Sequence, residues 1–212
     1  YLSQLDEAID RVMMGPAKKS RVYDEKTKKL VAYHESGHAI IGLYLEDSTV
    51  VQKVTIVPRG NAGGYNLMTP KDEKMMNTKS DLVAAITGFM GGRTAEELFF
   101  DDISTGAVND IERATNIARD MVTLYGMSDL GPIKYDSGNQ NVFLGRDYNS
   151  PSNVSGQIAF EIDQEIRKII DGCHKHAKQI IQEHKEELIM IATALIEYET
   201  LTAEQIERVI KG

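Results

Sequence analysis

His34-Glu35-Ser36-Gly37-His38 is the stretch of this chain that indicates most about its fold and chemistry. It is an H-E-x-x-H pattern inside a segment that is predicted to be helical. Two histidines four residues apart on a helix are separated by one turn plus about 40°, so both imidazoles can reach one metal ion. Glu35 can lean toward an open coordination position. Two nitrogen ligands and a carboxylate base beside the water that a metal activates are the arrangement that a zinc peptidase needs.

The sequence around this motif predicts a mainly α fold. Apolar residues on both sides of the motif predict a helix from about residue 25 to residue 45. Val50 to Val57 is rich in β-branched residues and stops at Pro58, which predicts a strand, and residues 65–68 predict a second strand that pairs back. Further helices are predicted at 1–14, 81–98, 107–125 and from 153 nearly to the C-terminus. We therefore expect a helical metallopeptidase domain with a small β-sheet beside the active-site helix.

Two segments are less regular. The predicted helix 81–98, capped by Ser80 and Asp81, contains three glycines that weaken it and indicate either close packing against a neighbour or a break; they are Gly88, Gly91 and Gly92. Residues 127–152 are rich in Gly, Pro, Asn and Asp and predict a long loop with a short strand at 142–144. Thr202 to Gln205 is a capping box that opens a last short helix.

A catalytic zinc site needs a third protein ligand, and two familiar places for it are empty. In the extended motif H-E-x-x-H-x-x-G-x-x-H, glycine and histidine would stand where this chain has Ile41 and Tyr44. Residues 54–60, where a glutamate about twenty residues downstream would lie, contain no acid. The remaining carboxylates near apolar helical patterns are Glu96, Glu97 and Asp110.

The residues alone do not choose among these acids. Asp110 lies near the start of a predicted helix, where an acid is also a common partner of the helix N-terminus. The motif itself has an alternative interpretation as a surface helix that happens to carry two histidines and a glutamate. The later histidines 174, 176 and 184 are interpreted as solvated or packing residues, and Cys173 as a small buried hydrophobic residue.

Composition limits the possible partners. The net charge of −8 argues against nucleic acid, because a phosphate backbone needs a basic surface. A single cysteine cannot form an internal disulfide, which fits a reducing compartment. No apolar run is long enough to span a bilayer, so we expect this stretch to be soluble. The chain begins inside a helical pattern rather than with methionine, so we expect it to be a fragment of a longer protein.

Several blocks, in this order, resemble the peptidase domain of the FtsH family of membrane-anchored, ATP-dependent AAA+ zinc metalloproteases. The resemblance covers nearly the whole chain. The blocks are Tyr33 to Ala39, Lys53 to Gly60, Gly91 to Glu97, Ser104 to Ile111, Lys134-Tyr135 with Val142 to Arg146, Asp163 to Glu165, and Tyr198 to Thr200.

This resemblance implies a specific site. It identifies Asp110 as the third ligand of one Zn²⁺ per subunit, beside His34 and His38, with Glu35 as the catalytic base. Glu96 and Glu97 are left with second-sphere or structural roles. It also implies that the strand matching Val51 to Val57 borders the cleft, where an extended polypeptide substrate could pair with it.

The resemblance also implies an assembly larger than this chain. It predicts a homohexamer, fed by an ATPase module and anchored by segments outside the fragment in the bacterial inner membrane, with this domain on the cytoplasmic side, or in an organellar equivalent. The chain contains no G-x-x-x-x-G-K-[ST] motif, so ATP and Mg²⁺ would bind only to the missing ATPase module. We expect residues 1–20 to be the linker tail from that module and residues 21–212 to be the zinc metallopeptidase domain.

Two other functions are compatible with the motif. A structural zinc domain would use four protein ligands, which would leave Glu35 without a purpose beside the metal. A non-proteolytic scaffold would normally have lost part of H-E-x-x-H, which is intact here. We therefore favour a peptidase that acts on unfolded or membrane proteins.

Overall fold

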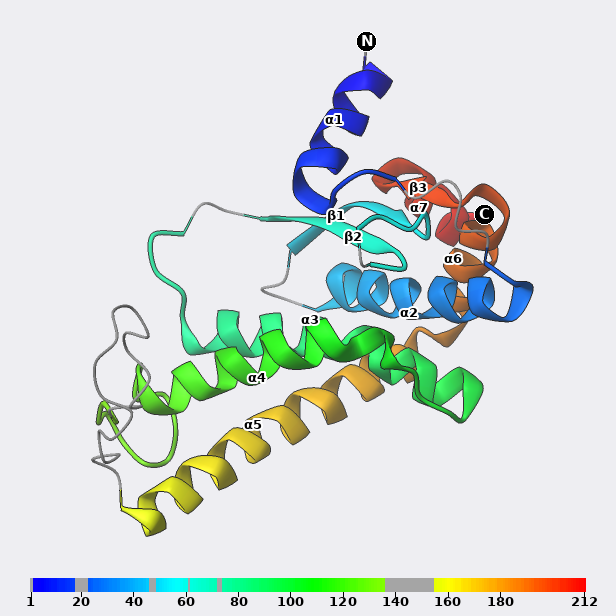
Figure 1. The fold of residues 1–212 in the computed structure, drawn as a ribbon. Helices are drawn as coiled ribbons and strands as arrows, with labels where there is room; N and C mark the ends of the chain where they lie inside the picture. Colours follow the sequence, from blue (N-terminus) through cyan, green and yellow to red (C-terminus); the bar gives the residue numbers. More distant parts are fainter. Residues whose placement is uncertain (1, 18–22, 46–48, 61, 72–73, 136–154) are drawn as a thin grey trace.

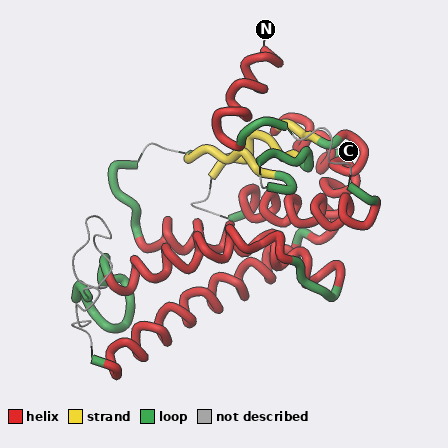
Figure 2. Tube along the Cα trace, viewed as in Figure 1, coloured by secondary structure: helices red, strands yellow, loops and turns green. Residues whose placement is uncertain are grey.

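Helix α2 (Glu25–Tyr44), which carries the H-E-x-x-H motif, lies in the middle of the fold (Figure 1). It packs against helices α3 (Lys79–Phe100), α5 (Gly156–Glu183) and α6 (Lys185–Tyr198) and against the sheet. The mainly α prediction is confirmed, since the strands form one small layer among helices (Figure 2). The computed structural model describes residues 2–17, 23–45, 49–60, 62–71, 74–135 and 155–212.

The part of α2 that carries the H-E-x-x-H motif is buried. Asp24 caps the helix by accepting a hydrogen bond from the Thr27 backbone N–H, and every residue from His34 to Gly42 is buried. Buried histidines and a buried glutamate need hydrogen-bond partners within the protein, whereas the same side chains on a solvated surface helix would bond to water. The alternative of a surface helix with accidental histidines is therefore wrong.

Helix α3 crosses α2 at a point where both helices have glycine. A Cβ atom on Gly37 would lie 2.3 Å from the carbonyl oxygen of Gly91, and a Cβ on Gly91 would lie 2.7 Å from that of Gly37. Gly91 therefore marks close packing, whereas a Cβ atom on Gly88 would meet no atom within 4 Å, and α3 is not broken at either glycine. Its cap differs from the prediction, because Thr78 is the N-cap and Asp81 completes a capping box, so α3 begins at Lys79.

Three antiparallel strands form the sheet, in the order β2-β1-β3. Strands β1 (Thr49–Thr55) and β2 (Tyr65–Pro70) confirm the two predicted strands. Strand β3 (Thr200–Thr202) was not predicted, and it pairs with the end of β1. Residues 53–55 of β1 are therefore bonded on both sides, so a substrate could not pair with the strand at these residues. Among the described residues, β2 is an outer strand of the sheet.

The predicted helical stretch after residue 153 is divided into three helices. His184, with φ −113° and ψ 33°, separates α5 from α6. Glu199, with φ 62°, ends α6 in the left-handed region, and α7 (Ala203–Lys211) follows β3. Thr202 and Gln205 form the predicted capping box of α7. The predicted strand 142–144 lies outside the described residues.

Two more helices complete the described fold. Helix α4 (Val108–Thr123) follows a short 3₁₀ turn, η1 (Thr105–Ala107), and packs against α3 and α5. Helix α1 (Leu2–Met14) is joined to the loop and strand around β1 by ion pairs, one between Asp10 and Lys53 at 2.5 Å and one between Glu7 and Arg59 at 2.6 Å.

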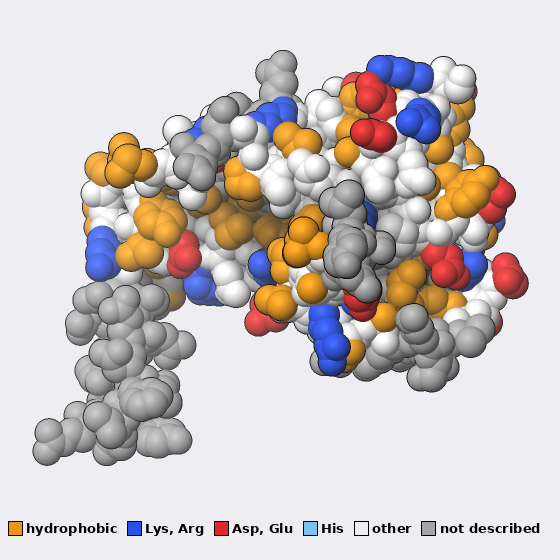
Figure 3. All heavy atoms as spheres, turned by 90° about the horizontal axis from the view of Figure 1, so that it is seen from above, with side chains coloured by type: hydrophobic (Ala, Val, Ile, Leu, Met, Phe, Trp, Pro, Cys, Tyr) orange, Lys and Arg blue, Asp and Glu red, His pale blue; other side chains and the backbone are white. Residues whose placement is uncertain are grey.

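The surface shown in Figure 3 carries hydrophobic, acidic and basic side chains next to one another, and no single sign of charge dominates its coloured part. None of the described helices combines the length and the apolarity that crossing a membrane requires.

Candidate metal centre

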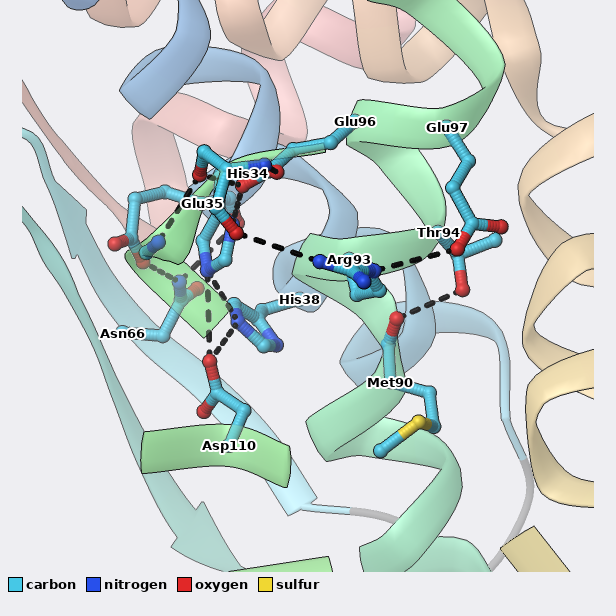
Figure 4. Close-up of polar contacts among 12 residues, drawn as sticks. His34, Glu35, His38, Asn66, Met90, Arg93, Thr94, Glu96, Glu97 and Asp110 are labelled. Atoms are coloured by element: carbon cyan, nitrogen blue, oxygen red, sulfur yellow. Dashed lines mark hydrogen bonds and ion pairs between the residues drawn. The ribbon is translucent and has the colours of Figure 1, made fainter. Parts of the chain in front are cut away.

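Three side chains from two helices converge beside the sheet. His34 and His38 of α2 and Asp110 from the first turn of α4 point toward one another (Figure 4). The two Nε2 atoms are 3.2 Å apart. Asp110 Oδ2 lies 3.5 Å from His34 Nε2 and 3.3 Å from His38 Nε2. The three side chains are 10%, 11% and 22% exposed, so the cluster is largely shielded from solvent.

These separations fit a tetrahedral zinc ion. Zinc binds histidine nitrogen and carboxylate oxygen at about 2.0–2.1 Å, and two ligands at tetrahedral angles are then about 3.3 Å apart. All three measured edges are close to this value. Two imidazoles and one carboxylate are also a donor set that catalytic zinc uses. The residues present therefore fit the metal.

The other nitrogen of each imidazole has an acceptor that fixes the ring. His34 Nδ1–H donates to Glu96 Oε1 at 2.7 Å, and His38 Nδ1–H donates to the backbone carbonyl of Gly88 at 2.8 Å. A carboxylate and a carbonyl can only accept, so in the neutral rings the proton lies on Nδ1 and the lone pair lies on Nε2. Both lone pairs are thus available where the three side chains meet.

Glu96 links the histidine helix to the loop before Asp110. Its carboxylate is 1% exposed and accepts hydrogen bonds from the Ser104 backbone N–H at 2.6 Å and from Ser104 Oγ at 2.9 Å. Ser104 Oγ also accepts from the backbone N–H of Gly106 in η1, which leads directly into α4. Burial raises the pKa of Glu96, but the hydrogen bonds from His34 and Ser104 lower it below its ordinary value.

Gly92 of α3 provides the space for the His34 ring. A Cβ atom at this position would lie 2.3 Å from Nε2, 2.5 Å from Cε1 and 2.6 Å from Cδ2 of that ring. Since a real Cβ atom does not approach that closely, the ring could not keep its position beside any other residue.

The charges of the cluster are strongly coupled. Burial lowers the pKa of His34, but hydrogen bonds to Asp110 and Glu96 and the charges of nearby carboxylates raise it to about 10. Burial raises the pKa of Asp110, but hydrogen bonds from His34 and His38 bring it well below its ordinary value. The site thus holds the anionic Asp110 carboxylate against a His34 imidazole that readily carries a positive charge, and a bound cation would take the place of that charge.

Glu35 lies on the same turn of α2 and is 6% exposed. Its carboxylate Oε2 accepts a hydrogen bond from Asn66 Nδ2 at 2.7 Å, and the same amide donates to the backbone carbonyl of Glu35 at 3.1 Å. Burial raises the pKa of Glu35, and this effect outweighs the charges of His34 and His38, which lower it. A carboxylate with a raised pKa accepts a proton more readily than an exposed one.

The other candidate residues lie elsewhere. The Glu97 carboxylate contacts Arg93 Nε at 3.4 Å and His174 Nε2 at 3.0 Å and is not part of the cluster. The remaining predictions are confirmed: His176 is exposed, the ring of His184 stacks on a tyrosine with the ring centroids 3.5 Å apart, and Cys173 is buried with 3% exposure.

Sequence reasoning missed three contributors to the site. The carbonyl of Gly88, the amide of Asn66 and the two donors of Ser104 are 50, 31 and 8 residues from the groups that they contact. Ser104 belongs to the block from Ser104 to Ile111, whose resemblance pointed to Asp110, so its position carried a signal. A backbone carbonyl and a single asparagine carried none.

Comparison with known proteins identifies the relatives of this chain. The profile of Peptidase family M41 matches residues 21–209. The chain is 57% identical over 208 residues to the ATP-dependent zinc metalloprotease FtsH of Acholeplasma laidlawii, covering 98% of the chain and 32% of that protein. It is 55% identical over 208 residues to the protein of the same name from Bacillus subtilis, covering 97% of the chain and 33% of that protein. The chain therefore spans about a third of the length of these relatives.

Proposed function

Because the chain belongs to peptidase family M41, we propose that it is the zinc-dependent endopeptidase domain of an ATP-dependent protease, and that it hydrolyses peptide bonds of unfolded or membrane polypeptides. The observation that carries this proposal is the meeting of His34 Nε2, His38 Nε2 and Asp110 Oδ2 at separations of 3.2–3.5 Å. The buried Glu35, which shares helix α2 with the two histidines, lies beside them.

His34, His38 and Asp110 would hold one zinc ion. Asp110 is favoured over the other two acids because its oxygen faces both Nε2 atoms, whereas Glu96 contacts His34 through the opposite ring nitrogen and Glu97 pairs with Arg93. Among the described residues, these three side chains are the cluster that could hold a metal ion. Three protein ligands leave the fourth position of a tetrahedral ion open. A purely structural zinc site would be closed by a fourth protein ligand, so this geometry favours catalysis over the structural alternative.

The chain's own residues would then divide the work of hydrolysis. Zinc, when bound, supplies a Lewis acid that polarises the scissile carbonyl and makes water more acidic. Glu35 accepts the proton of the attacking water and then delivers it to the leaving amine. Glu96 and the Gly88 carbonyl hold the two imidazoles in the tautomer that leaves Nε2 free.

The larger protein is also part of the proposal. Residues 21–212 form the peptidase domain and residues 1–20 the tail from an ATPase module, which alone would bind ATP and Mg²⁺. The family match at residues 21–209 and the relatives' name as ATP-dependent proteases support this division. From the same resemblance we infer a homohexamer anchored in a membrane by other segments, with this domain on the cytoplasmic side of a bacterial inner membrane or its organellar equivalent.

A protease assay on the full-length protein tests the activity. We expect casein to be degraded in the presence of ATP, degradation to stop when a chelator removes the metal, and zinc to restore it. Glu35→Gln should keep the bound zinc and lose at least about a hundredfold in rate, since general base catalysis contributes about 10²–10⁴-fold. Full activity of Glu35→Gln would refute the assignment of the base, and chelator-resistant degradation would refute the metal.

A further inference from the structure

We propose that Asn66 is a positioning residue that holds the carboxylate of Glu35 in the orientation needed to accept a proton. The inference rests on the proposed function and extends it to a residue of the sheet. Asn66 contacts neither His34, His38 nor Asp110 through any hydrogen bond in the described structure, so it would act only through Glu35.

The Asn66 amide donates hydrogen bonds to both the side chain and the backbone of Glu35. Nδ2 donates to Glu35 Oε2 at 2.7 Å and to the Glu35 backbone carbonyl at 3.1 Å, and it thereby spans the side chain (Figure 4). Both partners are acceptors, so the NH₂ group must face them, and a flipped amide would place oxygen against oxygen. Two simultaneous bonds allow fewer side-chain conformations of Glu35 than one bond would.

The sheet fixes Asn66 itself. Asn66 is paired with Val54 of the central strand β1, and Val54 is fully buried against the core. Gly64, two residues earlier, closes the other side of Glu35, because a Cβ atom there would lie 2.9 Å from both Cγ and Oε1 of the glutamate. The base is therefore held between α2 and the chain that enters β2.

This arrangement makes the two oxygens of Glu35 different. Oε2 is occupied by Asn66, while Oε1 lies beside the small Gly64. A glutamate side chain that is free to rotate must lose conformational entropy to reach the productive geometry. Misplacement by about 1 Å can lower the rate about a hundredfold. Because the site is buried, a hydrogen bond to the charged carboxylate is also stronger than it would be in water.

The first test is steady-state cleavage of a short peptide by the full-length protein with Asn66→Ala. We expect kcat to fall by about ten- to a hundredfold, the loss that corresponds to one hydrogen bond to a charged group. KM should stay within about twofold, because the interaction is with the base and not with the substrate. The zinc content should equal that of the wild type. An unchanged kcat, or a loss of zinc that accounts for the lost activity, would overturn the proposal.

Thr69→Ala is the matched control. Thr69 lies on the same strand and its hydroxyl accepts an exposed hydrogen bond from Gln52 at 3.0 Å, away from Glu35. We expect this variant to keep the wild-type kcat. A similar fall in both variants would show that any disturbance of β2 lowers activity and would contradict a specific role of Asn66.

A second variant and a second measurement keep the test decisive. Asn66→Asp keeps the shape of the side chain but removes the donor, and it should lose kcat at least as strongly as Asn66→Ala. Independently, a double-mutant cycle of Asn66→Ala with Glu35→Ala on the unfolding of the metal-free protein should be non-additive. Additive shifts of the denaturation midpoint would overturn the contact. An inactive wild type combined with non-additive shifts would refute the proposed function and leave the contact established.

Discussion

Gly92→Ala should weaken zinc binding without unfolding the domain. The new Cβ atom would lie 2.3 Å from Nε2 of His34, the nitrogen that faces His38 and Asp110. The ring cannot turn away cheaply, because its Nδ1–H is bonded to the buried Glu96 at 2.7 Å. The metal-binding nitrogen must therefore move, or α3 must separate from α2.

The required movement is large compared with the tolerance of a zinc site. Ordinary contact begins at 3.4 Å, so an atom at 2.3 Å must move by about 1 Å, whereas zinc–ligand distances vary by only about 0.2 Å. We therefore expect the zinc affinity to fall by at least the ~10–100-fold seen when a partner of a ligand is lost. Overpacking costs about 1–3 kcal/mol, and replacing a helical glycine returns about 1 kcal/mol, so the domain should remain folded.

Competition with a chromophoric zinc chelator measures the affinity, and chemical denaturation of the metal-free protein measures the stability. Gly88→Ala is the matched control one turn earlier on α3, since its Cβ would meet no atom within 4 Å and the carbonyl that holds His38 is retained. This control should keep zinc and gain up to about 1 kcal/mol of stability. Wild-type zinc affinity in Gly92→Ala would refute the steric argument.

Three further changes test the metal cluster. Asp110→Asn should lower zinc affinity because the anionic ligand is lost; unchanged metal content would point back to Glu96 or Glu97. Glu96→Gln should lower zinc affinity by about 10–100-fold, since it disturbs the partner of His34 Nδ1; an affinity within twofold of wild type would argue against that role. The pKa of His34 in the metal-free protein is raised from 6.5 to about 10, so its proton stabilises the fold fully below pH 6.5 and this contribution disappears as the pH rises toward 10. Denaturation of the metal-free protein between about pH 7 and pH 10 should therefore show falling stability that is weaker in His34→Gln, and equal slopes would contradict the shift.

The fold could be predicted wherever local patterns decide it. The apolar periodicity of α2 and α4 and the β-branched run of β1 gave the correct elements. Strand β3 was missed because three residues between two helices have no periodicity of their own. They pair with β1 only because Glu199 adopts φ 62° and ends α6, after which Leu201 is buried against Val54.

The site was predicted in part for the same reason. His34, Glu35 and His38 occupy neighbouring turns of one helix, so their spacing alone places them together. The resemblance to a known family pointed to Asp110, but the residues by themselves left Glu96 and Glu97 equally possible. The glycines of α3 were interpreted as a sign of either close packing or a break in the helix, and Gly92 was not connected with His34.

The sequence by itself determined the mainly α fold, the helix that presents two imidazoles and a carboxylate, and the family to which the chain belongs. Only the tertiary structure decided that Glu96, 62 residues from His34, contacts Nδ1 of its ring while Asp110 faces Nε2. It also decided that Asn66 of the sheet holds Glu35. The physical reason is one of scale. Periodicity fixes which face of a helix is apolar, whereas zinc ligation requires positions correct to a few tenths of an ångström, and these depend on how closely α2, α3 and α4 pack.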